Sequence, residues 1–462
     1  MSSNVSRGGA GLVVALIVGA VIGSSATYFL VPRGDPELLT EYEQQISQFE
    51  SMVDQYEYRI DELESKLSSE EELENQLDEL REQVDILQVQ LEETQEDLRS
   101  EFQVWWDEYR KPLTSDYSSY PAFLRGAYAQ RIDEARSYLM NADLLRGAGI
   151  DSILLAVDLV LDPGTGMPYT PAEEVFTFYV QAFKRAGFRV LLVADPCHPN
   201  LDLGEGFAWE PGMEGRYQPS PELLGRFDGA VVHIAEMAEE YGVYAFLPCI
   251  EPYKMSRDVG ATSDWLQSVQ AEIREVYGGK VGTTDIMFDI GKGYSEPFPY
   301  DYSGFDLILG GPPAGRKDAE SWESVIDVYI GKGVEYAQDY GAEGFGFYEW
   351  GGYQGGVWFE PIWEDQQLDD QEALEILEAG IRQGQGRLTY SFPRCSVGWV
   401  DLDKPTFQAL SDWYLSMGDP VEPVIRESWT YEELVVVEEA LAGFEDAYRQ
   451  IFMIDGPYPW PH

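Results

Sequence analysis

The sequence predicts an α/β protein built on a (β/α)8 barrel, which follows an apolar segment and a long helical segment. Between residues 117 and 420, short apolar runs alternate with amphipathic stretches, as in chains that fold into parallel sheets covered by helices. Eight such runs fit the eight strands of a (β/α)8 (TIM) barrel. No glycine-rich dinucleotide-binding fingerprint follows the first run, which disfavours the alternative, a doubly wound open sheet.

The expected strands are apolar runs that contain many β-branched and aromatic residues. They are expected at 123–130, 152–158, 189–195, 244–249, 280–288, 305–309, 344–348 and 387–392. The 3.6-residue period of the intervening stretches predicts helices at 132–146, 171–186, 221–241, 263–277, 319–340, 371–383 and 405–417. A last amphipathic helix within 421–462 is expected to pack with its tail on the outside of the barrel.

The N-terminal region contains a candidate membrane anchor. Residues 1–10 are mostly small or polar, whereas residues 11–31 are uncharged and mostly apolar and are long enough to span a bilayer. Arg7 precedes this segment and the flank beyond Arg33 is acidic, so the positive-inside rule predicts a single-pass protein with a cytoplasmic N-terminus and an extracellular C-terminal domain. A cleaved signal peptide ending at Ala26 is the alternative, and the anchor is favoured because the apolar run continues past that residue.

Residues 35–102 have the pattern of a coiled coil. Apolar residues recur every three or four positions from Tyr42 to Leu67 and from Leu73 to Leu98, with a break in phase at 68–72. Between positions 37 and 101 the chain has 22 acidic and four basic residues, so a lone helix would repel itself. The pattern therefore predicts a stalk that forms a homo-oligomer, with a solvated spacer as the alternative.

The overall composition excludes several classes of function. A net charge of −52 argues against nucleic-acid binding, which requires a basic surface. The chain has three histidines, too few to favour a His-rich metal centre or a Ser-His-Asp triad. No metal-ligand spacing repeats, so no metal or cofactor is expected. Three cysteines do not make a disulfide scaffold; a Cys197–Cys249 bridge and two free thiols both remain open.

Two carboxylates follow apolar runs of similar design. Glu251 ends the run that begins at Ala245, and Glu349 ends the run that begins at Ala342. These runs are the fourth and seventh expected strands, whose C-terminal ends converge on the face where barrels of this type have their active sites. Such a pair suits glycoside hydrolysis with retention, in which one carboxyl donates a proton and the other attacks the sugar. The structural alternative for either glutamate is a loop ion pair or a helix cap.

Other polar and aromatic residues near the expected strand ends are candidates for substrate binding, because aromatic rings stack on sugars and polar groups bind hydroxyls. They are Arg125, Tyr128, Asp158, Asp195, His198, Tyr253, Asp289, Tyr348, Trp350, Tyr353 and Trp358.

Three segments resemble clan A glycoside hydrolases, most closely family 113 and more distantly families 53 and 5. They are Val232–Glu251, Trp265–Gly282 and Phe347–Tyr353. The resemblance implies a TIM barrel and a retaining hydrolase of a polysaccharide or glycan. It further implies a two-glutamate double displacement, with Glu251 as the acid/base and Glu349 as the nucleophile.

A non-catalytic carbohydrate-binding or structural cell-surface protein on the same barrel is the alternative function. The clan usually has an asparagine before the acid/base, where it contacts the 2-hydroxyl of the sugar, and this chain has Ile250. The run Phe305–Pro313 also has no Tyr or His at its end, where the clan has an aromatic residue.

Overall fold

We analysed a computed structural model of the chain. The structure describes residues 51, 53–60, 71–114, 116–130, 132–159, 161, 166, 168, 173–196, 219–256, 258–285, 307–310, 319–348, 370–393, 395, 402–422 and 427–442. The chain divides into a helical unit, which contains α3 (Glu71–Tyr109) and α14 (Tyr431–Ala442), and a barrel unit that begins at Pro112.

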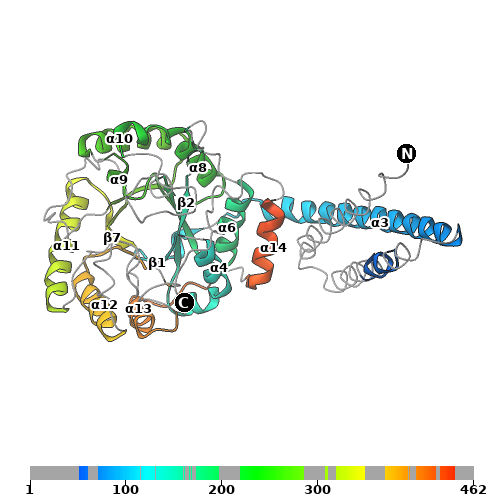
Figure 1. Ribbon diagram of the computed structural model, residues 1–462. Coiled ribbons are helices and arrows are strands. Elements are labelled where there is room, and N and C mark those ends of the chain that lie inside the picture. The colour runs from blue at the N-terminus through cyan, green and yellow to red at the C-terminus, as the bar shows by residue number, and fades with distance from the viewer. Residues whose placement is uncertain are drawn as a thin grey trace. The chain divides into compact units, whose positions relative to one another are not determined.

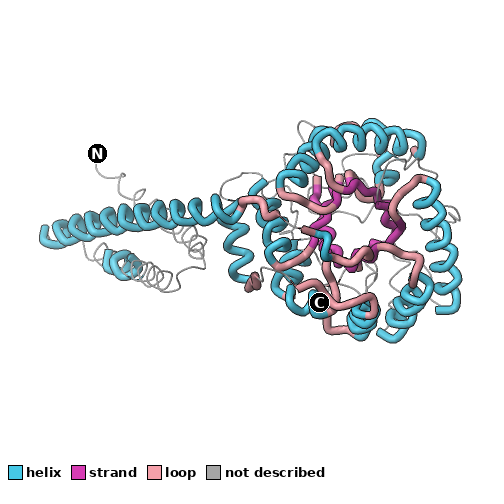
Figure 2. Tube along the Cα trace, turned by 180° about the vertical axis from the view of Figure 1, so that it is seen from behind, coloured by secondary structure: helices cyan, strands magenta, loops and turns pink. Residues whose placement is uncertain are grey.

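The barrel unit contains eight parallel strands that pair in sequence order and close into a ring, which confirms the predicted (β/α)8 fold. The strands are β1 (Leu124–Ala129), β2 (Ser152–Asp158), β3 (Arg189–Asp195), β4 (Ala245–Leu247), β5 (Lys280–Asp285), β6 (Leu307–Gly310), β7 (Gly344–Tyr348) and β8 (Tyr390–Phe392). Closure is made by β1 and β8, where Leu124 pairs with Tyr390. Figure 2 shows the ring of strands surrounded by helices.

The helices lie outside the ring (Figure 1). They are α4 (Ile132–Met140), α5 (Ala142–Gly147), α6 (Glu173–Arg185), α7 (Pro221–Leu224), α8 (Asp228–Glu240), α9 (Pro252–Ser256), α10 (Val259–Val276), α11 (Ala319–Asp339), α12 (Asp370–Gly384) and α13 (Pro405–Leu415). Two expected helices are each divided, at Asn141 and at 225–227. Asparagine and glycine favour such breaks because both are poor helix formers. The short helix α9, which directly follows Glu251, was not predicted.

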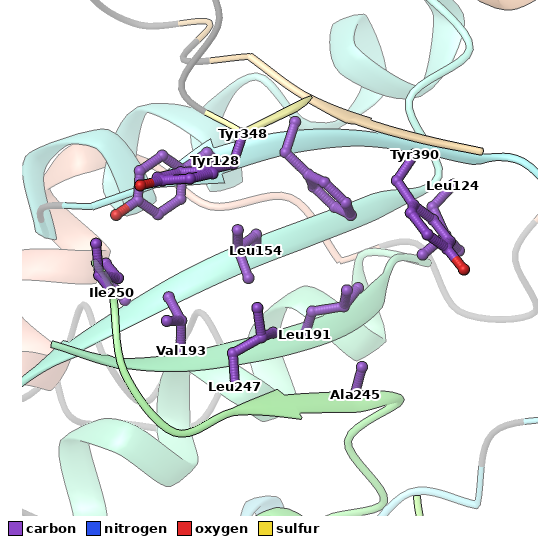
Figure 3. Packing of buried hydrophobic residues seen from close by; sticks show 12 residues of the cluster. Leu124, Tyr128, Leu154, Leu191, Val193, Ala245, Leu247, Ile250, Tyr348 and Tyr390 are labelled. Atoms are coloured by element: carbon purple, nitrogen blue, oxygen red, sulfur yellow. The ribbon is translucent and has the colours of Figure 1, made fainter. Parts of the chain in front are cut away.

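Side chains from β1–β4, β7 and β8, together with Ile250 after β4, fill the interior of the barrel (Figure 3). They form one buried apolar cluster: Leu124, Tyr128, Leu154, Ala156, Leu191, Val193, Ala245, Leu247, Ile250, Tyr348, Tyr390 and Phe392. A Cβ atom on Gly126 would lie 2.0 Å from the Phe392 ring, so the absence of a side chain on β1 makes room for an aromatic side chain on β8.

A buried ionic cluster lies at the N-terminal end of the barrel. Asp151 precedes β2 and accepts hydrogen bonds from Arg125 Nε at 3.1 Å and Arg189 Nη2 at 2.6 Å. All three side chains are at most 2% exposed. Two arginines share one carboxylate, so one positive charge is left over, and a carbonyl and an aromatic ring stabilise it. Arg125 Nη1 donates to Gly418 O at 2.7 Å, and the Arg189 guanidinium lies over the Tyr120 ring.

In the helical unit, the two halves of the heptad stripe pack on each other within one chain. The packed residues are Val53, Tyr56 and Ile60 from 53–60 and Leu80, Val84 and Leu87 from α3. Val53 and Leu87 are equally far in sequence from position 70, as are Ile60 and Leu80, which indicates an antiparallel pair centred on the break in phase at 68–72. Figures 1 and 2 both show 53–60 beside α3.

This arrangement differs from the predicted stalk between chains. Over the described part of the stripe, the partner of α3 is residues 53–60 of the same chain. From Glu432 onward α14 groups with α3 in the helical unit, and Trp429, just before α14, packs edge-on against Phe178 of α6. The expected packing of the rest of 421–462 on the barrel stays a prediction. Among the described helices, none is both long and apolar enough to cross a bilayer; residues 11–31 lie outside the described part of the chain.

An antiparallel hairpin predicts a crosslink inside one chain. In the V53C/L87C variant of residues 35–462, we expect oxidation to form an intrachain disulfide, because both positions belong to one packed cluster. Non-reducing electrophoresis should show a monomer, and peptide mapping should identify the bridge. V53C/L80C is the matched control, since its two positions lie about two helical turns out of register. A covalent dimer formed by V53C alone would instead support a parallel stalk between chains.

Candidate functional site

Glu251 occupies a strained position where the chain leaves the barrel after β4. Its φ is +50°, and among the described residues it is the one non-glycine residue with a positive φ. Side chains with a Cβ atom rarely adopt this conformation, and such strain occurs often at functional sites. Glu251 is 5% exposed, so its carboxyl group lies in a nearly enclosed position between β4 and α9.

The strained turn is held through its backbone by the two neighbouring strands. The Glu251 N–H donates to Thr284 Oγ1 at 3.2 Å, and the Thr284 hydroxyl donates to Cys249 O at 3.1 Å. On the other side, the Ile250 N–H donates to Ala194 O at 3.1 Å. One hydroxyl from β5 therefore connects both ends of the turn, and β3 fixes its middle.

The Glu251 side chain is held from across the barrel. Tyr348, the last residue of β7, donates its hydroxyl to Glu251 Oε1 at 3.0 Å. The Tyr348 ring packs edge-on against Tyr128 on β1, with ring centroids 5.9 Å apart and planes at 82°. Figure 3 shows the two tyrosines beside each other at the Ile250 end of the apolar cluster. Three predicted site residues thus meet at the C-terminal end of the barrel.

The tyrosines have a different position from the one expected for sugar contacts. Tyr128 is 0% exposed and Tyr348 is 1% exposed, so both rings belong to the barrel core and neither offers a face to a ligand. The burial of the Tyr348 ring differs from the exposed ring face that sugar stacking requires. Tyr348 instead contacts the candidate acid directly.

Three further predicted residues lie at the same end of the barrel. Asp158 and Asp195 are the last residues of β2 and β3 and are partners in the strand register. Asp195 is buried, while only the backbone of Asp158 is described. Tyr253 lies on α9 and is half-buried, two residues after Glu251.

Arg125 does not belong to this site. It is the second residue of β1, and its side chain lies in the buried ionic cluster at the N-terminal end of the barrel. The sequence analysis placed Arg125 and Tyr128 together, although residues three positions apart on a strand face opposite sides. Because Tyr128 points into the barrel, Arg125 points outward, toward Tyr414 O and Gly418 O.

The remaining predicted residues lie outside the described part of the chain and stay predictions. They are His198, Asp289, Glu349, Trp350, Tyr353 and Trp358. Among the residues that are described, no group of His, Cys, Asp and Glu side chains could hold a metal ion. The Cys249 thiol is buried and donates to Ile250 O at 3.2 Å, whereas Cys197, its possible disulfide partner, lies outside the described part of the chain.

Thr284 is the site residue that the sequence analysis missed. It carries no charge and lies within an expected strand, so nothing in its residue type marks it. Its position in the strand register would have indicated it. Ala245, which faces the interior, pairs with Lys280, and side chains alternate along a strand, so Thr284, four residues later, also faces the interior. A hydroxyl on the inner face near a strand end can bond to a neighbouring turn.

Comparisons with known proteins give likenesses in structure. No protein-family profile matches the chain, and no curated protein matches it. Two solved structures of a family 113 β-1,4-mannanase have 14% identity, cover 64% of this chain and 99% of their own, and have TM-scores of 0.44 and 0.45. The family 113 β-mannanase AaManA from Alicyclobacillus acidocaldarius has 15% identity over 64% of this chain and 98% of its own, with a TM-score of 0.41.

A family 1 β-glucosidase from Thermotoga maritima has 12% identity over 63% of this chain and 87% of its own, with a TM-score of 0.41. The matches therefore include the family that the segments around Glu251 and Glu349 resemble. Identities this low and TM-scores below 0.5 say nothing about the activity of this chain, and the barrel is established by its own strand pairing.

Two adjacent threonines provide a matched test of how the turn is held. Thr284→Val leaves the Glu251 N–H and Cys249 O without their partner, so we expect a loss of about 2 kcal/mol in the free energy of unfolding. Thr283 is equally buried, and its hydroxyl has no hydrogen-bond partner among the described residues. Thr283→Val should therefore be neutral or slightly stabilising. Urea unfolding measures both, and equal losses would contradict the role of Thr284.

Proposed function

We propose that the chain is a retaining glycoside hydrolase in which Glu251 is the general acid and base and Glu349 is the nucleophile. The observation that carries this proposal is the Glu251 carboxyl, which lies at the C-terminal end of the barrel in a strained, nearly enclosed turn and is bonded from the opposite strand. Barrels of this type have their active sites at this end. A carboxyl that is fixed and shielded from water suits proton transfer to a leaving group.

The proposed reaction has two steps. In the first, protonated Glu251 gives its proton to the glycosidic oxygen as the bond from that oxygen to the anomeric carbon breaks. The Glu349 carboxylate attacks the same carbon from the other face and forms a glycosyl ester. In the second step, ionised Glu251 removes a proton from water, which displaces Glu349 and releases the sugar with its original configuration.

The sequence position of Glu349 supports its role. It directly follows Tyr348, whose hydroxyl reaches the Glu251 carboxyl. Tyr348 lies at the C-terminal end of β7, and the eight parallel strands of a barrel have their C-terminal ends on one face. We therefore assign Glu349 to the same end of the barrel as Glu251.

Variants at the two glutamates should differ in their dependence on the leaving group. Against unactivated glycosides, E251A should lower kcat by about 10²–10⁴-fold, because general acid catalysis is lost. With 2,4-dinitrophenyl β-glycosides the leaving group needs no proton, so formation of the glycosyl ester should persist, and added azide should give a glycosyl azide of retained configuration. E349Q should abolish turnover of both substrate types. A panel of aryl glycosides and β-linked oligosaccharides, followed by NMR, measures rate and configuration.

Glu343→Gln is the matched control, since Glu343 lies before β7 and is half-exposed in an ion pair with Lys280. It should keep wild-type turnover. Unchanged turnover in E349Q, or a wild-type protein that hydrolyses nothing in the panel, would contradict the proposed reaction.

Ile250 favours a second candidate, a non-catalytic carbohydrate-binding protein. Its side chain is 2% exposed and packs in the apolar cluster, so it offers no hydrogen bond to a sugar hydroxyl. Binding on a glycan array without hydrolysis of the bound glycan would select this candidate over the hydrolase.

We further propose that residues 11–31 anchor the chain in a membrane, with the barrel on the outside. The length of this uncharged segment and the position of Arg7 before it support the proposal. In membranes of expressing cells, the full chain should resist extraction by alkaline carbonate, and external protease should digest the barrel. N-terminal sequencing should give Met1 or Ser2; a mature protein that begins at Thr27 would show a cleaved signal peptide instead.

A further inference from the structure

We propose that Tyr348 is a positioning residue for Glu251, which fixes the orientation of the carboxyl group and directs its transferable proton to Oε2. This inference rests on the proposed function, because it assigns a task within the acid catalysis of Glu251. It differs from the role expected from the sequence, in which Tyr348 would contact the sugar.

The first argument is geometric. Tyr348 and Glu251 are 97 residues apart, and their side chains meet at 3.0 Å from the seventh strand and the turn after the fourth. Tyr348 is held in place by the strand register with Phe392 and by the edge-on contact with Tyr128. With 1% exposure, the ring cannot turn out to stack on a ligand without leaving the core.

The second argument is chemical. A phenol keeps its proton at pH values where a carboxyl group titrates, since their ordinary pKa values are about 10 and 4.3. The Tyr348 hydroxyl therefore donates to Glu251 Oε1 during the catalytic cycle. An oxygen that accepts this bond is a poor site for a second proton, so the proton given to the leaving group is carried by Oε2.

The third argument is that the two kinds of restraint complement each other. Thr284 and Ala194 hold the backbone of the turn, which fixes the Glu251 Cα but leaves the side-chain torsions free. The bond from Tyr348 restricts those torsions, so the carboxyl group itself is held in position. The position of the carboxyl group matters because a displacement of about 1 Å at a reacting group can cost about 10²-fold in rate.

The test compares Tyr348→Phe with Tyr390→Phe. Both remove one hydroxyl from the same apolar cluster, but Tyr390 is at the opposite, N-terminal end of the barrel, where it pairs with Leu124. Y348F should lower kcat against unactivated glycosides by about 10–100-fold with KM changed by less than about twofold. Y390F should keep the wild-type kcat.

The dependence on the leaving group separates positioning from a general loss of structure. In Y348F, kcat against unactivated glycosides should fall, whereas the rate of ester formation from 2,4-dinitrophenyl glycosides, which needs no acid, should change little. A wild-type kcat in Y348F, in a protein that does hydrolyse glycosides, would overturn the inference.

A readout without turnover keeps this inference distinguishable from the proposed function. In protein labelled with ¹³C at the glutamate carboxyl groups, E251Q identifies the Glu251 signal, and its chemical shift and line width are compared in wild type, Y348F and Y390F. A change in Y348F but not in Y390F supports the inference even where no substrate is hydrolysed, in which case the proposed function fails alone. A Glu251 signal that is the same in Y348F as in wild type overturns the inference whether or not the protein is active.

Discussion

Closure of the barrel is the constraint on which the rest of the structure depends. Once Leu124 of β1 pairs with Tyr390 of β8, every strand has two neighbours and each inward side chain has a fixed set of contacts. Closure also brings the turn after β4 close enough to the end of β7 for Tyr348 to donate a hydrogen bond to Glu251, although 97 residues separate them in sequence. Glu251 and Tyr348 come from the turn after β4 and the end of β7, so their contact depends on the closed ring.

The two ends of this ring meet different physical demands. At the N-terminal end, one carboxylate serves two arginines, and backbone carbonyls and aromatic rings compensate the remaining charge. Removal of Asp151 would leave two buried guanidinium groups without their carboxylate, and breaking a buried ion pair in this way typically costs about 3–5 kcal/mol. At the C-terminal end, the Glu251 carboxyl receives one side-chain bond from Tyr348 and sits on a strained backbone. The arrangement separates groups that stabilise the fold from a group that can change protonation state.

The sequence predicted the strands better than it predicted which way their side chains face. All eight strands lie where apolar runs occur, because a parallel sheet covered by helices is buried on both faces. For the same reason the runs contain little information about direction: every residue of β1 is buried, including both Arg125 and Tyr128. Alternation alone would have separated these two residues, and the inward parity of Thr284 becomes visible only once the register with β4 is known.

The heptad stripe shows the corresponding limit for helices. A repeat of apolar residues every three or four positions requires a partner, but it does not specify whether the partner belongs to another chain. The break in phase at 68–72 was the relevant signal, since the paired residues Val53 and Leu87 lie symmetrically about it. A discontinuity between two stripes of similar length therefore indicates a reversal of the chain as readily as a local change in winding.

The position of Glu251 connects these points to function. A non-glycine residue in the left-handed region costs about 1–3 kcal/mol. The two hydrogen bonds through Thr284 and the one from Tyr348 contribute about 1 kcal/mol each, so together they can offset that cost. A glycine would adopt the same backbone without strain, but it would lose the hydrogen bond from Tyr348. In the proposed function, the need for a carboxyl group at the C-terminal end of the barrel explains why a strained glutamate stands where β3, β5 and β7 converge.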